Sequence, residues 1–244
     1  VTIIQGYGMT ESSAMCALLT PKFFQYGCVG CPMPSVEVRL VDVAEAGYFA
    51  NGNPPQGEIC IRGPSVTQGY YKRPEITKES ITPDGWLLTG DVGQWNPDGT
   101  LCIIDRKKNL VKLSGGEYIA IERLESAYKA SGVVSNICVV ASPDAKQPMA
   151  VVFPREEALR SALRENGKDS LADKQLTDLC HEKEVSQMVL RDLNSLGKQS
   201  NFATMELLQC VVLIPEELPL TAAQKVQRKE VEKKYHDLIK RVYP

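Results

Sequence analysis

Histidine is scarce in this sequence, and long apolar runs are absent from it. Only His181 and His236 occur among the 244 residues, so chemistry that depends on a histidine base or ligand is disfavoured. No apolar run approaches the roughly 18 residues that indicate a membrane-spanning helix. The first residues, VTIIQGYG, contain neither the basic segment nor the cleavage site of a signal peptide. The carboxyl-terminal KRVYP matches no peroxisomal or endoplasmic-reticulum retrieval signal.

A strong excess of charge of either sign is also absent. The formal net charge is −2, which argues against a nucleic-acid partner held by a basic surface. Apolar residues make up 43% of the chain and charged residues 24%, as in a globular protein with one large or two small domains. The chain starts without methionine, inside a strand-like run, so we expect a piece of a longer protein.

The eight cysteines lie mostly within apolar segments such as GEICIRG and NICVVA. This pattern is typical of reduced thiols that pack as small hydrophobic groups. Cys28 and Cys31 form one C-x-x-C pair. Because there is no second pair and no histidine nearby, the pair favours neither a zinc site nor a redox centre.

The first hundred residues are rich in glycine and proline and contain short apolar runs. Residues 35–43 and 57–63 alternate as strands do. The turn sequence NPDG, residues 96–99, separates two further apolar runs, which predicts a hairpin because Pro97 fixes φ and Gly99 can close the turn. We therefore expect a small, twisted, mostly antiparallel β unit.

The character of the sequence changes after Asp105. A basic connection with two glycines leads into strand-like and helix-like segments that alternate, as in a small α+β domain. Helical spacing is clear around residues 121–128 and in an amphipathic helix predicted over residues 221–243, with Val231, Tyr235, Leu238 and Val242 on one stripe. We place the boundary between Ile104 and Leu110.

The stretch QGYGMTE, residues 5–11, combines features that suit a nucleotide. Its glycines permit close approach of the backbone to a ligand. Tyr7 offers a flat face for an adenine ring, Thr10 a hydroxyl for a phosphate oxygen, and Glu11 a hard oxygen ligand for Mg²⁺. The alternative is a plain turn from a strand into a loop.

Asp91 and Arg106 are the next candidates along the chain. A carboxylate such as Asp91 can accept hydrogen bonds from both hydroxyls of a ribose, although a turn-capping aspartate is common. Arg106 follows a strand, where its guanidinium could reach the ribose or a phosphate. The alternative for the run RKK is a solvated basic loop.

Four segments in this order resemble one family. They are QGYGMTE, LLTGD, IIDRKKNLVKLSGGEYI and LTAAQKVQRK. The order resembles the carboxyl-terminal part of the adenylate-forming superfamily, which comprises acyl-CoA synthetases, luciferases and non-ribosomal adenylation domains. The details look most like a long-chain fatty acyl-CoA synthetase of the fungal type.

The resemblance implies an α+β fold in two parts. Residues 1–105 would be the end of the large AMP-binding domain, as a mostly β, distorted barrel-like subdomain. Residues 106–109 would be a hinge, with Lys108 as the residue about which the domains turn. Residues 110–244 would form the small, mobile carboxyl-terminal α+β domain.

The resemblance also implies roles for single residues in nucleotide binding. Tyr7 and Gly8 would contact adenine, and Thr10 would contact the α-phosphate. Glu11 would bind magnesium. Asp91 would bind the ribose.

Further roles follow for the basic junction and the last motif. Arg106 would reach the ribose or the α-phosphate. Gly115 and Gly116 would face the CoA pantetheine after the small domain rotates, or form a structural turn. Lys225 would enter the site during adenylation. The segment IPEELPLTAAQK before it is shorter than in typical long-chain synthetases.

The implied activity is ATP-dependent activation of a fatty acid through an acyl-adenylate to acyl-CoA, with ATP, Mg²⁺ and CoA. The family's phosphate loop is missing, so this piece should be inactive without the upstream region of the same enzyme. The resemblance implies a cytosol-facing protein and leaves open a peripheral attachment to the endoplasmic reticulum, peroxisome or lipid droplet. Two alternatives stay open: an aryl- or other acyl-CoA ligase, and a non-catalytic nucleotide-binding module.

Overall fold

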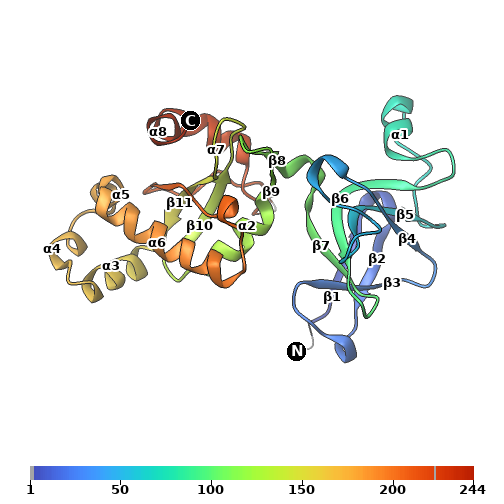
Figure 1. The fold of residues 1–244 in the computed structure, drawn as a ribbon, viewed down its shortest axis with the longest axis horizontal. Coiled ribbons are helices and arrows are strands. Elements are labelled where there is room, and N and C mark those ends of the chain that lie inside the picture. Colours follow the sequence, from blue (N-terminus) through green and yellow to red (C-terminus); the bar gives the residue numbers. More distant parts are fainter. Residues whose placement is uncertain (1–2, 223) are drawn as a thin grey trace. The chain divides into compact units, whose positions relative to one another are not determined.

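The chain forms two compact units. A computed structural model describes residues 3–222 and 224–244. The units comprise Val1–Leu110 and Val111–Pro244, and Figure 1 shows a β-rich first unit and a second unit in which helices surround strands. The α+β class predicted from the sequence is confirmed.

The amino-terminal unit is built around a seven-stranded sheet with the order β1-β2-β3-β7-β6-β5-β4. Every neighbouring pair in it is antiparallel. No described residues pair β1 with β4, so hydrogen bonds do not close the sheet into a barrel. The strands are β1 Gln5–Met9, β2 Ala14–Leu19, β3 Cys28–Pro32, β4 Glu37–Val41, β5 Gln56–Arg62, β6 Leu87–Trp95 and β7 Leu101–Arg106, and helix α1 is Pro74–Ser80.

The hairpin predicted around NPDG is confirmed. Strands β6 and β7 pair in antiparallel register, and the amide of Gly99 donates to the carbonyl of Asn96 at 3.0 Å. Gly99 has φ +83°, a conformation that glycine adopts without the steric cost of a Cβ. The hairpin matters because it sets Asp91 on β6 directly opposite Arg106 on β7.

The carboxyl-terminal unit holds a three-stranded sheet of order β10-β11-β12 and a two-stranded ribbon, β8-β9. The strands are β8 Leu110–Lys112, β9 Tyr118–Ala120, β10 Val134–Val140, β11 Met149–Pro154 and β12 Cys210–Leu213. The helices are α2 Ile121–Tyr128, α3 Glu156–Glu165, α4 Asp169–Ala172, α5 Leu176–His181, α6 Lys183–Gln199, α7 Arg228–Lys234 and α8 His236–Val242.

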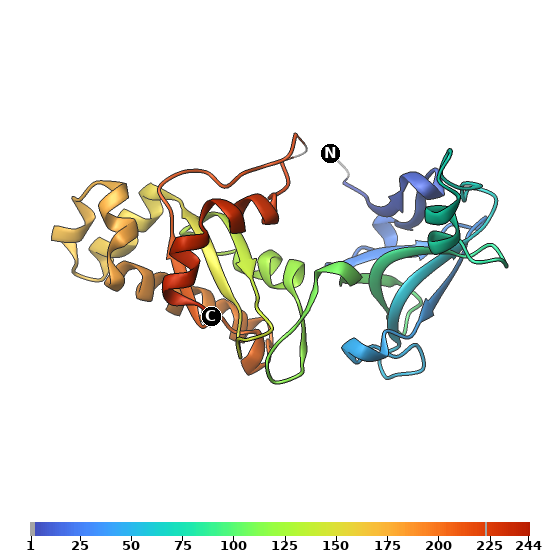
Figure 2. The ribbon, with the colours of Figure 1, turned by 90° about the horizontal axis from the view of Figure 1, so that it is seen from above.

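Alternation along the strands divides this unit into two cores. Ile137 and Val139 of β10 pack in a cluster with residues of α2, α3, α5 and α6. Cys138 and Val140 pack on the other side with residues of α7 and α8, because successive strand residues point to opposite faces. Figure 2 shows helices on both sides of these strands. β12 ends the sheet, with β11 as its only described partner.

The single amphipathic helix predicted over residues 221–243 is wrong in part. The regular helix begins only at Arg228, and Tyr235, with φ −107° and ψ 18°, separates α7 from α8. Val231 and Tyr235 are buried as predicted, but Val242 is 48% exposed.

None of the helices in the described parts of the chain is long and apolar enough to cross a lipid bilayer.

Candidate functional site

In the motif QGYGMTE, the backbone at Gly8 of β1 packs closely against the backbone of Ala14 and Met15 of β2. Gly8 faces Met15 across the β1–β2 pair, and the register shifts between Tyr7 and Gly8. A Cβ at Gly8 would overlap the carbonyl oxygen of Ala14. Residues 6–10, Ala14 and Met15 line an open pocket of about 590 Å³. The close backbone contact therefore requires glycine at position 8, whether or not a ligand binds there.

Ser12, which was not predicted from the sequence, stabilises the turn after β1. Its side chain is fully buried. Its hydroxyl oxygen accepts the amide of Met9 at 3.2 Å and lies 3.1 Å from the carbonyl oxygens of Met9 and Ala14. A hydroxyl residue three positions after a strand's end is a signal for such a local cap.

Replacing Gly8 by alanine should lower the free energy of unfolding of the amino-terminal unit by about 1–3 kcal/mol, the usual cost of overpacking. The added methyl group meets fixed backbone, which cannot rotate away. Urea unfolding should be compared with Gly6→Ala in the same strand, where the nearest atom to the new Cβ lies at 3.3 Å. Equal stability of the two variants would contradict the close backbone packing at Gly8.

Asp91 is the centre of the candidate site. The hydroxyl of Tyr7 donates to its Oδ2 at 2.7 Å, and Nε of Arg106 lies 3.5 Å from its Oδ1. The Asp91 side chain is 14% exposed and that of Arg106 is 48% exposed. The structure thus brings together three predicted residues from β1, β6 and β7 and leaves a small part of the Asp91 side chain exposed.

Burial, and then the nearby charge of Asp91, raise the pKa of Tyr7 far above its usual range. The phenol therefore remains protonated and acts as a hydrogen-bond donor. Its ring also packs against the core of the amino-terminal unit. The predicted stacking of adenine on Tyr7 stays a prediction, and the hydrogen bond to Asp91 is an additional role.

A second group of polar residues supports the strand at Asp91. Thr89 donates to the carbonyl of Ile59 at 2.7 Å and accepts the amide of Asp91 at 3.1 Å. The buried carboxylate of Glu58 accepts the amide of Gly90 at 3.1 Å and pairs with Lys107 at 3.0 Å. Glu58 was not predicted from the sequence, although a carboxylate within an apolar strand is a signal for such a supporting role.

Glu11 lies in the short 3₁₀ turn Thr10–Ser12 that follows β1. Its Oε1 accepts the hydroxyl of Tyr70 at 2.7 Å, and its carbonyl accepts the amide of Thr67 at 2.8 Å. No described residues form a cluster of three or more ligands for a metal. One carboxylate is nevertheless sufficient for Mg²⁺ that is held mainly by nucleotide phosphates and water, so Glu11 fits this ion.

The other predicted residues lie mostly in turns and short connections of their own unit. Thr10 is exposed at the end of β1, next to the pocket. Lys108 is exposed in the short 3₁₀ turn Lys107–Asn109. Gly115 and Gly116 form the turn between β8 and β9, where Gly116 has φ +94° and donates to Leu113 at 2.9 Å.

The sequence predicted Lys225 at the start of the last helix, and this placement is wrong. It is exposed in a loop that ends three residues before α7 begins at Arg228. The loop is closed by Thr221, whose amide donates to the Lys225 carbonyl at 2.8 Å and whose hydroxyl accepts the Lys225 amide at 3.2 Å. No ion pair of the described residues involves the Lys225 ammonium.

The two cysteines of the C-x-x-C pair have different surroundings. Cys28 is buried and lies opposite Cys102 across β3 and β7, with 2.7 Å between the sulfur atoms. Cys31 is exposed. Only one thiol of the pair is therefore accessible to solvent, and the other faces Cys102.

The chain is similar to known proteins in both sequence and fold. Residues 1–71 match the family model described as AMP-binding enzyme. The chain is 47% identical over 232 residues to Long-chain-fatty-acid--CoA ligase 1 of Schizosaccharomyces pombe and 39% identical over 244 residues to Long-chain-fatty-acid--CoA ligase 1 of Homo sapiens. These matches cover 93% and 98% of this chain, but only 34% of each relative.

Solved structures give the same fold. The adenylation domain of carboxylic acid reductase from Segniliparus rugosus, solved with AMP and a co-purified carboxylic acid, matches with a TM-score of 0.77 at 29% identity. It covers 98% of this chain, which in turn spans 34% of that one. The corresponding A-PCP didomain with AMP has a TM-score of 0.79 at 30% identity and 99% coverage, with 31% of that chain covered.

The sequence matches and the matching solved structures confirm the resemblance found in the sequence. Nearly the whole chain aligns with these long-chain fatty acid–CoA ligases, and the chain spans about one third of the length of each of them. This coverage is consistent with a carboxyl-terminal part.

Proposed function

We propose that this chain forms part of a long-chain fatty acid–CoA ligase that makes AMP. ATP would react with a fatty acid to give an acyl-adenylate and pyrophosphate, and the thiol of CoA would then displace AMP. The observation that carries the proposal is the 47% identity to such a ligase across 93% of the chain. Identity to the carboxylic acid reductase domains is lower, at 28–30%, which favours a fatty acid over the substrates of those enzymes.

The geometry around Asp91 supports the nucleotide part of this proposal. A carboxylate that accepts one bond from Tyr7 and keeps a loose contact with Arg106 has acceptor capacity left for a ribose diol. Arg106 is half-exposed and free to turn toward a phosphate. Mg²⁺, when bound by Glu11 and the phosphates, would supply positive charge against which the anionic carboxylate can approach.

The remaining residues would act on the developing charge and on position. Thr10 would donate its hydroxyl to the α-phosphate. Lys225 would contact the α-phosphate and the fatty acid carboxylate, and a cation there stabilises charge that develops in the transition state. Gly115 and Gly116 would let the backbone approach the pantetheine of CoA.

The decisive experiment uses a complete enzyme with the upstream region present. Fatty-acid-dependent exchange of pyrophosphate into ATP should be observed with long-chain acids and be absent with aryl acids. Exchange with aryl acids only would favour the aryl-CoA ligase. Calorimetry that detects ATP binding, together with no exchange with any acid, would favour a non-catalytic nucleotide-binding module.

Replacing Asp91 by alanine in the complete enzyme should weaken nucleotide binding by about tenfold or more. Hydrogen bonds to a charged group contribute about 1.5–3 kcal/mol. Calorimetric titration with ATP measures the effect, and Asp84→Ala, an exposed carboxylate in the turn before β6, is the control. If a folded Asp91→Ala variant binds ATP with unchanged affinity, Asp91 does not bind the ribose and the turn-capping alternative is favoured.

The basic junction is proposed to act as a hinge between the two parts, with Lys108 in residues 106–109. Lys108 is exposed in a short 3₁₀ turn, where it can change φ and ψ and stay solvated. Limited proteolysis with trypsin should cut first between Arg106 and Lys112. Protection of this segment, with faster cleavage elsewhere, would contradict the hinge.

The partners and the location follow from the same proposal. Fatty acid, ATP and CoA would be the small-molecule substrates, and the upstream region of the enzyme would complete the site. The protein would face the cytosol, with peripheral attachment to the endoplasmic reticulum, peroxisome or lipid droplet to be tested by fractionation of the complete enzyme.

A further inference from the structure

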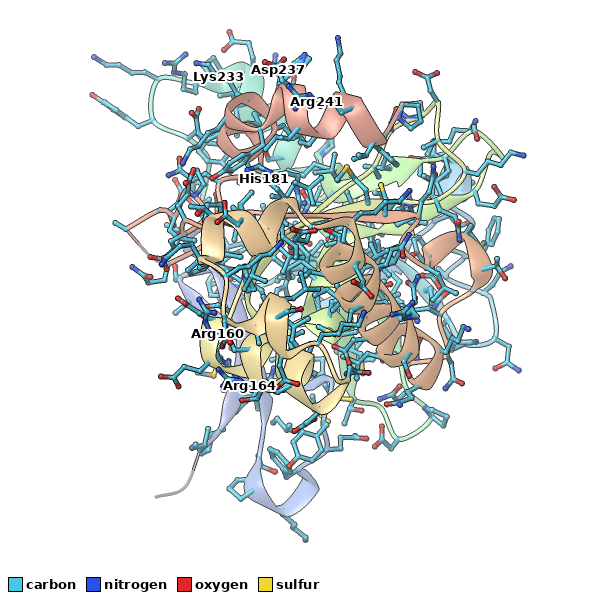
Figure 3. The ribbon with its side chains drawn as sticks, turned by 90° about the vertical axis from the view of Figure 1, so that its left-hand side faces the viewer. Arg160, Arg164, His181, Lys233, Asp237 and Arg241 are labelled. Carbon is cyan, nitrogen blue, oxygen red and sulfur yellow. The ribbon has the colours of Figure 1, made fainter. Side chains whose placement is uncertain are left out.

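A groove of about 590 Å³ lies in the carboxyl-terminal unit, among residues that carry none of the roles above. It follows the edge strand β12, between α5 and α6 on one side and α8 on the other, and is called the β12 groove. Its volume is within the roughly 300–1,000 Å³ of pockets that take small molecules. Figure 3 shows Arg241 on α8 and His181 on the helix layer below it.

The floor of the β12 groove is apolar. Leu190 of α6, Val212 of β12 and Leu238 of α8 line it, and all three are only half-buried. Cys180 and Cys210 also line it, and burial raises the pKa of each thiol to about 11. Both thiols are therefore neutral near pH 7, and the interior carries no negative charge.

The rim of the β12 groove is basic. His181, Lys183 and Arg241 line it, and no acidic residue does so among the described residues. The ion pairs of the described chain use neither Lys183 nor Arg241. Asp237 precedes Arg241 by one turn of α8, but no ion pair joins them. Two cations thus remain available beside an apolar floor.

We propose that the β12 groove is a binding site for a single-chain amphipathic anion, an aliphatic chain with a carboxylate or phosphate head. The chain would replace water along the apolar floor, and the head would lie between Lys183 and Arg241. A peptide strand added to β12 is a weaker occupant, because this strand offers only four residues. The inference rests on the carboxyl-terminal unit alone and is independent of the proposed catalytic function.

The test is a titration of the 244-residue chain with dodecanoate below its micellar concentration, observed by methyl NMR. The methyl signals of Leu190, Val212 and Leu238 should shift and saturate together. Dodecyl phosphate serves as the second arm, and the tighter of the two ligands identifies the head group. Dodecanol, which lacks the charge, should bind about threefold to tenfold more weakly, because it loses an exposed ion pair with each of the two cations.

Variants separate charge from volume. Lys183→Gln and Arg241→Gln should each weaken dodecanoate binding by about threefold, while Lys240→Gln, on α8 but outside the groove lining, should leave it unchanged. Gln187→Trp fills the groove from an exposed position and should abolish the shifts. No saturable shift at the floor, equal binding of dodecanol, or an equal effect of Lys240→Gln would overturn the proposal.

Discussion

Replacing Lys225 by alanine in a complete enzyme should slow formation of the acyl-adenylate by about 10²–10³-fold, the usual cost of losing one preorganised electrostatic contact. The lysine lies in an exposed loop and its ammonium joins no ion pair of the described residues, so its charge remains available for a ligand. Transfer to CoA from a supplied acyl-adenylate should fall much less, because under the proposed domain rotation this lysine leaves the phosphate before the second step.

The two half-reactions must be measured separately, by pyrophosphate exchange and by thioester formation from the acyl-adenylate. Lys229→Ala is the matched control, since Lys229 is an exposed lysine of the same motif on α7. Equal losses in both steps would show that Lys225 acts through folding or docking. An unchanged rate of adenylation would show that the shortened segment before Lys225 keeps the lysine out of the site.

Local chemistry made part of the fold predictable. The hairpin could be placed because Pro97 and Gly99 specify a turn between two apolar runs, whatever surrounds it. The strands of the carboxyl-terminal unit were recognisable because both of their faces are buried, which requires continuous apolar runs.

The start of the last helix at Arg228 and its break at Tyr235 could not be predicted in the same way. Apolar spacing continues through Tyr235, but the hydroxyl of Thr221 accepts the backbone amide of Lys225 at 3.2 Å. Such side-chain bonds compete with the helix, and they depend on residues that helical periodicity does not consider.

In the candidate site, too, the residue types could be predicted from local sequence but their contacts could not. The residue types in QGYGMTE and LLTGD indicated a nucleotide, but the bond between Tyr7 and Asp91 joins positions 84 residues apart. Such a contact follows from the pairing order of the sheet and not from either motif. Glu58, which supports the strand beside Asp91, was missed because its partners Gly90 and Lys107 come together only in the folded sheet.

Replacing Arg228 by methionine should lower the free energy of unfolding of the carboxyl-terminal unit by about 3–5 kcal/mol, the cost of leaving a buried charge without its partner. Nη1 of Arg228 lies 2.8 Å from Oε1 of Glu125 and also donates to the carbonyl of Val139. The same carboxylate oxygen accepts the amide of Val139 at 2.8 Å. The side chains of Glu125 and Arg228 are 10% and 24% exposed, so water compensates little for the loss.

Urea unfolding followed by far-UV circular dichroism measures this effect, because most of the helices lie in the carboxyl-terminal unit. Lys234→Ala, which removes an exposed ion pair with Glu216, should cost no more than about 1 kcal/mol. Adding Glu125→Gln to Arg228→Met should restore part of the stability, because the unpaired charge is then gone. A cost of Arg228→Met no greater than that of Lys234→Ala would mean that the buried pair does not hold α7 in place.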